Sequence, residues 1–145
     1  MIIRPFCTSD HSEWFALRSA LWPECQQADN EKDARLFTSK PHQFAVFVSE
    51  SDGHLTGFLE ASLREYADGC ATSPVGYVEG WYVLPNYRLS GVGRALIEAA
   101  EDWARARGCT EMASDALLDN TASHQAHQKV GYTEVERAVR YRKHL

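Results

Sequence analysis

Hydrophobic residues recur along the chain at two different spacings, which predicts both helices and strands. In the first half, Trp14, Leu17 and Leu21 are spaced as on one face of a helix, and Ser51-Asp52-Gly53 is a hairpin turn signal between two apolar runs. This half is therefore expected to contain, in order, a strand at Ile2–Pro5, a helix that begins at Ser9 or Asp10 and ends at Trp22-Pro23, a polar stretch at Glu24–Asp33, a short helix ending near Pro41, and a hairpin of Phe44–Val48 with Leu55–Ala61.

The second half alternates strand and helix patterns. An amphipathic face predicts its longest helix, and the face consists of Val92, Leu96, Ile97, Ala100 and Trp103. This half is expected to contain a surface loop at Glu65–Pro74, a strand at Val75–Leu84, that helix from Gly91 to Gly108, a strand at Glu111–Ala116, a helix at Thr121–Val130 and a last strand at Thr133–Tyr141. The order β-α-α-β-β-β-α-β-α-β predicts a mixed α/β fold with parallel strand pairing in its later half.

Length and charge narrow the class of protein. The 145 residues predict a single domain over residues 1–145, and 44% hydrophobic with 24% charged residues are typical of a globular protein. A formal net charge of −5 argues against a general nucleic-acid binder, which needs a basic surface. No apolar run approaches the ~20 residues of a membrane helix. Met1–Phe6 lacks the layout of a secretion signal, so we expect a cytoplasmic protein that binds neither membranes nor nucleic acid.

The cysteines do not form a metal or disulfide pattern. Cys7, Cys25, Cys70 and Cys109 are far apart, so reduced, mostly buried thiols are expected, with no zinc site and no cysteine nucleophile. The sequence also contains an H-x-x-H pair ending at His127, but no further ligand stands at a matching spacing. No metal is expected.

A strand, a glycine-containing turn and an amphipathic helix follow one another between Trp81 and Leu96. Backbone N–H groups at a helix start have no internal partners, and the helix dipole favours an anion there. Gly91 and Gly93 would let a phosphate approach the main chain, and two arginines in the same segment add positive charge. A dinucleotide fingerprint would need a third glycine where Leu96 stands. Two incidental glycines at a helix start remain the alternative explanation.

This segment resembles a known family. Arg88-x-x-Gly91-x-Gly93, after a strand that ends Tyr82-Val83-Leu84-Pro85, resembles the acyl-CoA pyrophosphate loop of the GNAT superfamily of N-acetyltransferases, and Asn120 followed by His127 and Gly131-Tyr132 resembles its second cofactor segment. More narrowly, the chain resembles bacterial aminoglycoside 6′-N-acetyltransferases from Ile3-Arg4 to Arg142-Lys143. The stretches that carry this likeness are Leu59–Tyr66, Ser73–Val75, Glu79–Pro85 and Glu111–Ala116.

The resemblance implies a bent mixed sheet, flanked by helices and split between its two central parallel strands, with acetyl-CoA in the opening. It places a bulge at Gly80–Val83 and assigns to the N–H of Val83, or of its neighbour Tyr82, the polarisation of the thioester carbonyl. Losing one such donor can cost ~3 kcal/mol. The cofactor contacts that it implies are Trp81, Tyr82, Val83, Arg88, Leu89, Ser90, Gly91, Val92, Gly93, Arg94 and Asn120.

The resemblance also implies an acceptor site for a polycation. Its aromatic members are Trp22 and Tyr66, and its carboxylates are Glu79, Asp115 and Glu136. Carboxylates can hold ammonium groups through charge-assisted hydrogen bonds, and aromatic faces can cover sugar rings. The simpler alternatives are that Trp22 is a core or capping aromatic and that Asp115 and Glu136 are merely solvated. Glu79 interrupts an apolar strand, which packing alone does not explain, because an unpaired buried charge is costly.

The implied reaction is direct attack of an amine on the thioester. Deprotonating an alkyl amine at pH 7 costs ~4 kcal/mol, and we expect Glu79 to accept that proton through a water. The family's usual tyrosine, seven residues after Asn120, is replaced by His127, which could protonate the leaving thiolate. Alternatively, the thiolate takes its proton from water.

Two rival functions remain on the sequence alone. One is acetyl transfer to another amine, such as a polyamine or a peptide amine, and the other is a non-catalytic acyl-CoA sensor. The resemblance further implies a homodimer, which an aromatic content of 11% supports only loosely.

Overall fold

The computed structural model describes residues 1–145 as a five-stranded sheet flanked by four helices. The elements in chain order are β1 (Ile2–Pro5), α1 (His11–Leu21), α2 (Gln27–Ser39), β2 (Phe44–Ser51), β3 (His54–Arg64), β4 (Val75–Val83), α3 (Val92–Arg105), β5 (Met112–Ser114) and α4 (Thr121–Lys129), with 3₁₀ turns at Thr8–Asp10 and Pro85–Tyr87. No helix is long and apolar enough to cross a bilayer.

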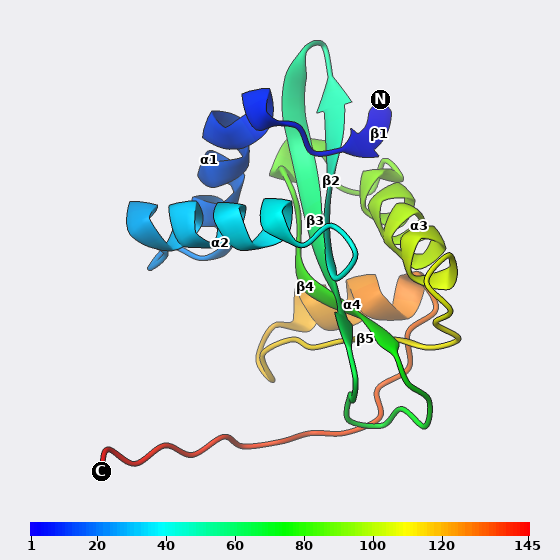
Figure 1. The fold of residues 1–145 in the computed structure, drawn as a ribbon. Coiled ribbons are helices and arrows are strands. Elements are labelled where there is room, and N and C mark those ends of the chain that lie inside the picture. Colours follow the sequence, from blue (N-terminus) through cyan, green and yellow to red (C-terminus); the bar gives the residue numbers. More distant parts are fainter.

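The sheet has the strand order β1-β2-β3-β4-β5. Neighbouring strands from β1 to β4 are antiparallel, whereas β4 and β5 are parallel over three residue pairs, from Gly76 with Met112 to Val78 with Ser114. Helices α1 and α2 lie on one side of the sheet and α3 on the other (Figure 1). The predicted mixed fold and its late parallel pairing are confirmed.

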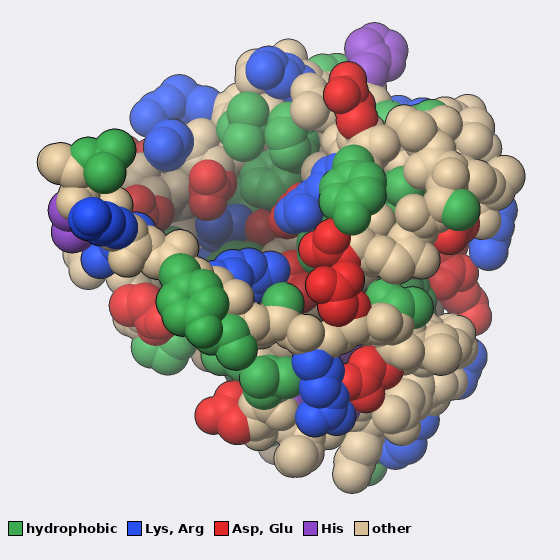
Figure 2. Space-filling view, turned by 90° about the horizontal axis from the view of Figure 1, so that it is seen from below, with side chains coloured by type: hydrophobic (Ala, Val, Ile, Leu, Met, Phe, Trp, Pro, Cys, Tyr) green, Lys and Arg blue, Asp and Glu red, His purple; other side chains and the backbone are tan.

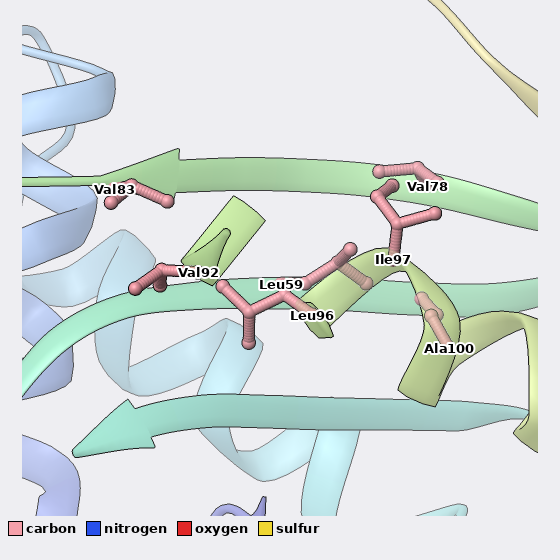
Figure 3. Close-up of a cluster of buried hydrophobic side chains, with 8 residues drawn as sticks. Leu59, Val78, Val83, Val92, Leu96, Ile97 and Ala100 are labelled. Carbon is pink, nitrogen blue, oxygen red and sulfur yellow. The ribbon is translucent and has the colours of Figure 1, made fainter. Parts of the chain in front are cut away.

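Two apolar cores hold the layers together. On the α3 side, eight buried residues interlock between helix and sheet, namely Leu59, Ala61, Val78, Val83, Val92, Leu96, Ile97 and Ala100 (Figure 3). Trp103 packs against this cluster from its margin. The amphipathic face predicted for the long helix is therefore the face that it buries. The second core lies under α1 and α2 and contains Trp14, Leu17, Ala34, Val46, Val48, Leu55 and Phe58.

The hairpin prediction is confirmed, and the start of the second helix is corrected. Asp52 and Gly53 adopt φ values of 53° and 78°, the left-handed pair that a tight hairpin turn requires. Helix α2 begins at Gln27, inside the stretch expected to be irregular. The Gln26 N–H donates to the Asp29 carboxylate at 3.0 Å, so a polar capping contact starts the helix before any apolar spacing indicates it.

The last predicted strand, Thr133–Tyr141, is wrong for this chain. Residues 133–145 form neither helix nor strand. Residues 133–140 still border a cavity of the chain, and the end of the segment then runs away from the body of the molecule (Figure 1). Val135 and Val139 are 65% and 70% exposed, and Tyr141 is 92% exposed. The alternating pattern is present, but this segment pairs with no strand of the sheet, and a strand needs a partner for its backbone groups.

The four cysteines are free, as expected, but they are not mostly buried. Cys109 is buried, Cys25 and Cys70 are half-buried, and Cys7 is exposed. The Cys7 thiol lies against Asp10, whose carboxylate also accepts two hydrogen bonds from Arg4. This ion pair fixes the entry of α1 and lowers the pKa of Asp10 to about 2.

Candidate active site

The sheet splits beyond the end of β5, where β4 continues without a partner strand on that side. The pairing of β4 with β5 stops at Val78 and Ser114, although β4 continues to Val83. Leu84 N–H donates to Thr56 of β3 at 2.9 Å. Because successive N–H groups along a strand point to opposite sides, the N–H of Val83 faces the opening.

The same alternation determines which way the N–H groups of the two residues before Val83 point. Trp81 lies two residues before Val83, so its N–H also faces the opening. Tyr82 lies between them, paired with Phe58, and its N–H points to β3. The expected donor at Val83 fits this geometry, and the alternative donor at Tyr82 does not. Trp81, which the resemblance names as a cofactor contact without assigning it this role, is a second backbone donor on the open side.

The bulge in β4 lies at Glu79. Glu60 pairs with Gly80 and Ala61 pairs with Val78, so Glu79 is the extra residue. The resemblance placed the bulge at Gly80–Val83, immediately after this position, and the register corrects it. A Cβ on Gly80 would lie 2.5 Å from Cη2 of Trp22, so glycine is required for this close approach.

The turn between β4 and α3 has the geometry of an anion cradle. Residues 88–91 are exposed, Leu89 and Gly91 adopt φ values of 62° and 89°, and α3 begins at Val92. No side chain caps the start of α3, so its first N–H groups are free for a ligand. A Cβ on Gly91 would meet nothing within 4 Å, which leaves open space in front of these donors. The cradle fits a diphosphate.

The two arginines of the cradle, Arg88 and Arg94, donate hydrogen bonds to backbone carbonyls next to it. Arg88 Nε donates to the Val83 carbonyl at 2.8 Å and its guanidinium lies 5.4 Å from the ring centroid of Tyr82. Arg94 donates to the carbonyl of Lys129 at 2.7 Å, at the end of α4. Both cations therefore remain near the turn while they tie it to β4 and to α4.

His127 is fixed at both ring nitrogens. Nδ1 lies 2.7 Å from the Ser123 carbonyl, and Nε2 lies 2.7 Å from Ser114 Oγ. A carbonyl can only accept, so Nδ1 carries a proton, and Nε2 shares a hydrogen bond with a serine hydroxyl that can either donate or accept. The ring packs edge-on between Trp81 and Tyr132, at centroid distances of 5.3 and 5.8 Å.

Asn120 is the N-cap of α4. Its Oδ1 accepts from Ser123 N–H at 3.1 Å, which leaves the side-chain amide nitrogen free for a ligand. His124 lies 2.9 Å from the Leu117 carbonyl rather than beside a second ligand. No group of three or more histidine, cysteine, aspartate or glutamate side chains is placed to hold a metal ion.

Glu79 is an engaged, half-buried carboxylate. Its Oε1 accepts from Ser62 Oγ at 2.6 Å and from Arg64 Nε at 3.0 Å. Arg64 Nη2 donates to Oε2 at 2.8 Å. The charge that interrupts the apolar strand is therefore paired, which removes the cost expected for an isolated buried carboxylate.

A cavity of about 1020 Å³ brings together several of the predicted residues. Tyr66, Asp115, Glu136 and His127 line it, whereas Trp22 and Glu79 are not among its lining residues. Arg64, the partner of Glu79, does line it. Seen from below, the molecule is hollowed, with acidic, basic and hydrophobic side chains bordering the hollow (Figure 2).

The cavity residues differ in how firmly they are held. Tyr66 is 69% exposed and its hydroxyl donates to Asp68 at 2.9 Å. Glu136 is exposed on the C-terminal segment. Asp115 accepts from the Tyr77 hydroxyl at 2.5 Å, and burial together with this carboxylate raises the pKa of Tyr77. Asp115 is thus oriented by a buried residue, Tyr77, whereas the partner of Tyr66, Asp68, is itself exposed.

Trp22 is held by a buried ionic network. The Arg18 guanidinium lies between the rings of Trp14 and Trp22, at 5.2 and 5.0 Å from their centroids. Arg18 pairs with the buried Glu60 and with Asp33. Burial raises the pKa of Glu60 to about 7, because desolvation outweighs the attraction of Arg18. Trp22 therefore ends α1 and also packs against the bulge at Gly80.

The free N–H groups of β4 and the open turn before α3 are features that the likeness to acetyltransferases implies. Comparison with models of known families tests this likeness. Residues 13–132 match the model of the acetyltransferase (GNAT) family. The chain belongs to the GNAT family.

Aminoglycoside N(6′)-acetyltransferases are similar to this chain over almost its full length. An aminoglycoside N(6′)-acetyltransferase type 1 of Klebsiella aerogenes is 44% identical over 147 residues, covering 99% of this chain and 97% of that protein. The enzyme of the same name from Acinetobacter baumannii is 41% identical, covering 100% and 99%.

Solved GNAT structures agree with the fold over the full length. AAC(6′)-Iy in complex with the bisubstrate analog CoA-S-monomethyl-acetylneamine superposes with a TM-score of 0.94 at 38% identity, covering 99% of this chain and 98% of that one. The apo structure of AAC(6′)-IG from Acinetobacter haemolyticus also gives 0.94, at 39% identity and coverage of 100% and 99%. The GNAT fold expected from the sequence is confirmed.

Several residues of this GNAT site could not be found from sequence motifs. Arg64 and Ser62 bind Glu79 from fifteen or more residues away, and Arg18, paired with Glu60, stacks on Trp22. The only available signal was a charged or polar residue in an otherwise apolar element, and that signal names no partner.

Proposed function

We propose that the protein transfers the acetyl group of acetyl-CoA to the 6′-amino group of aminoglycosides and thereby confers resistance to them. The observation that carries the proposal is the junction in β4 between a carboxylate at the bulge, Glu79, and backbone donors that face the opening toward the cradle. The full-length similarity to aminoglycoside N(6′)-acetyltransferases supports it. A single domain and a cytoplasmic location belong to the same proposal.

Acetyl-CoA supplies a reactive acetyl thioester in this reaction. The diphosphate is assigned to the exposed turn and the first turn of α3, from Arg88 through Leu89, Ser90, Gly91, Val92 and Gly93 to Arg94. Trp81 and Val83 present N–H groups along the opening, and Asn120 offers its free amide to the cofactor arm. A donor aimed at the carbonyl oxygen stabilises the negative charge that develops there during attack.

The acceptor is assigned to the acidic and aromatic residues around Glu79. Trp22 is packed against Gly80, next to Glu79, and is available to cover a sugar ring. Asp115, Tyr66 and Glu136 line the cavity and are available to bind further ammonium groups. A polycation with several amines and few apolar faces matches this combination better than a neutral ligand does.

The proton steps follow from the same contacts. Glu79 is assigned to accept the proton of the attacking amine, through a water. Both ring nitrogens of His127 are engaged within the chain, and Nε2 contacts Ser114 Oγ at 2.7 Å. This contact supports the route in which the leaving thiolate takes its proton from water, a step that a thiol of ordinary pKa near 8.5 allows.

Replacing Glu79 with glutamine tests the assignment of the base. We expect kcat to fall by about 10²–10³-fold, the scale of losing a positioned proton acceptor, while the affinity for acetyl-CoA is unchanged. The measurement is thiol release with acetyl-CoA and kanamycin across the pH range, with binding of CoA followed by calorimetry. Unchanged turnover at every pH would rule out the role of Glu79 as the base.

The same assay separates the two rival functions. Thiol release with polyamines or peptides, but not with kanamycin, would show that the acceptor is another amine. Binding of CoA without release for any amine would make the protein a sensor. The aromatic pair Trp22 and Tyr66 favours the aminoglycoside weakly, since flat aromatic faces suit rings, whereas the carboxylates would suit a polyamine equally well.

We further propose a homodimer built by the C-terminal segment. Val135, Val139 and Tyr141 would lie on one face of an extended strand, with Arg137 among them, and are exposed, and β5 is an edge strand of three residues. Pairing of this segment with β5 of a second copy would give the alternating pattern the partner that it lacks. Glu136 would then reach the site from the neighbouring protomer.

Sedimentation tests this assembly. The full chain is expected to be dimeric, and a chain truncated after Tyr132 is expected to be monomeric while it retains its far-ultraviolet circular dichroism. A monomeric full chain, or a dimer that survives the truncation, would contradict the proposal.

A further inference from the structure

The charge of Glu79 is already balanced within the chain. Arg64 donates to both carboxylate oxygens, at 3.0 and 2.8 Å, and Ser62 donates to one of them at 2.6 Å. Two parallel N–H···O bonds are the geometry in which a guanidinium holds a carboxylate best. Only about one of the roughly four acceptor positions of the carboxylate is left open. An incoming ammonium group therefore meets a carboxylate that is already in use.

Arg64 uses the same recognition chemistry as a cationic acceptor. Its guanidinium carbon lies 3.4 Å from the ring centroid of Tyr77, and the Tyr77 hydroxyl donates to Asp115 at 2.5 Å. A carboxylate on one side and an aromatic face on the other form a site for any cation. The proposed function assigns Glu79 and Asp115 to the ammonium groups of the acceptor, so Arg64 occupies a position that the acceptor needs.

Arg64 is also placed so that it can leave. Its side chain is 41% exposed and that of Glu79 is 28% exposed. Arg64 is the last residue of β3, next to the irregular segment at residues 65–74. An ion pair with this exposure contributes little net free energy, because water solvates the guanidinium once it turns outward. Arg18, which is 3% exposed, has no such route.

We propose that Arg64 is an internal counter-cation of the acceptor site and that an ammonium group of the aminoglycoside displaces it from Glu79. This inference rests on the proposed function and deepens it. Arg64 then determines acceptor affinity and specificity, since only a ligand with a cation at this point recovers the contact. Its departure also releases the carboxylate that the proposed mechanism uses as the proton acceptor.

Replacing Arg64 with glutamine tests the proposal. We expect the dissociation constant of kanamycin, measured by calorimetry, to fall about three- to tenfold, which is the scale of a partly exposed ion pair. The affinity for CoA should be unchanged. Arg64→Lys keeps a competing cation and should bind kanamycin within about twofold of the wild type.

Two controls separate local competition from a general change in charge. Arg105 also borders the cavity and pairs with Glu101 and Asp102, so Arg105→Gln removes the same charge without freeing Glu79. It should change kanamycin affinity by less than about twofold, because its charge is 63% exposed and screened. In a Glu79→Gln background, Arg64→Gln should bring no gain, since no carboxylate remains to be released.

The opposite results would overturn the proposal. Weaker or unchanged kanamycin binding by Arg64→Gln, or an equal gain from Arg105→Gln, would make Arg64 a positioning residue that holds Glu79 for the acceptor. If the wild type bound CoA but no aminoglycoside, the proposed function and the role of Arg64 would both fall. If the wild type bound and acetylated kanamycin, only the role of Arg64 would be at stake.

Discussion

Replacing Arg18 with methionine should lower the free energy of unfolding by about 3–5 kcal/mol, the cost of leaving a buried charge without its partner. Glu60 is 2% exposed and loses its only cationic contact in this variant. Chemical denaturation monitored by tryptophan fluorescence and by circular dichroism measures the change. Arg105→Met removes two exposed ion pairs instead and should cost less than about 1 kcal/mol.

The pH dependence identifies the cause of this loss. The pKa of Glu60 in the folded state, about 7, lies above its value of 4.5 in an unfolded chain. Proton uptake therefore stabilises the folded state most below about pH 4.5, and this contribution is lost as the pH rises through 7. Without Arg18, the pKa of Glu60 rises further, so the penalty should be smaller at pH 5 than at pH 8.

A second substitution shows whether the pair is needed for stability at all. Arg18→Met combined with Glu60→Leu removes both charges and should recover most of the lost stability, as apolar replacements of buried ion pairs do. A double variant as unstable as the single one would show instead that the aromatic stacking of Arg18 on Trp14 and Trp22 is the main contribution.

The second large effect is expected at the cradle. Gly91→Asp should weaken CoA binding by about a hundredfold, since it adds a carboxylate beside the proposed diphosphate and a few kcal/mol of repulsion at close range is ordinary in a partly desolvated site. Aspartate tolerates the left-handed backbone of this position, φ 89°, better than most residues, so the fold should persist.

Two matched variants control for backbone strain in that experiment. Gly91→Asn has the same shape without the charge and should bind CoA within about tenfold of the wild type. Gly53→Asp introduces the same residue at φ 78°, in the hairpin turn, where a Cβ also meets nothing within 4 Å. It should leave CoA affinity unchanged. Equal losses in all three variants would show that stability, and not the charge in the cradle, explains the effect.

Local patterns predicted the parts of the fold that depend on neighbouring residues in the chain. The apolar face of α3 and the Asp52-Gly53 turn are examples, because helical spacing and turn conformation depend on a few consecutive positions. The start of α2 at Gln27 was missed because a polar capping contact, and not hydrophobic spacing, begins that helix.

The prediction of a strand in the C-terminal segment, at Thr133–Tyr141, was wrong for a different reason. Val135, Val139 and Tyr141 would share one face of a strand, interrupted by Arg137, but a strand exists only where another strand accepts its hydrogen bonds. Nothing within residues 133–145 indicates where that partner lies. The pattern therefore indicated that the segment can form a strand, but a single copy of the chain offers it no strand to pair with.

Site residues were predicted where a residue type is unusual for its strand or helix. They were missed where their role depends on a partner that is distant in the sequence. Glu79 was singled out because a charge interrupts an apolar strand, and the structure pairs it as that cost requires. Arg64 drew no notice, since an arginine at a strand end is ordinary. Backbone donors such as the N–H of Trp81 carry no sequence signal at all, because every residue except proline has one.

The early end of β5 has a consequence for how the unpaired part of β4 avoids aggregation. A strand with unpaired N–H groups is normally a template on which another polypeptide can add and aggregate. Here the unpaired length of β4 belongs to an interior strand whose last residue, Val83, is only 9% exposed, so the template is recessed behind its neighbours. A slender molecule with amide groups of its own can reach these donors, whereas a second sheet is too broad to enter.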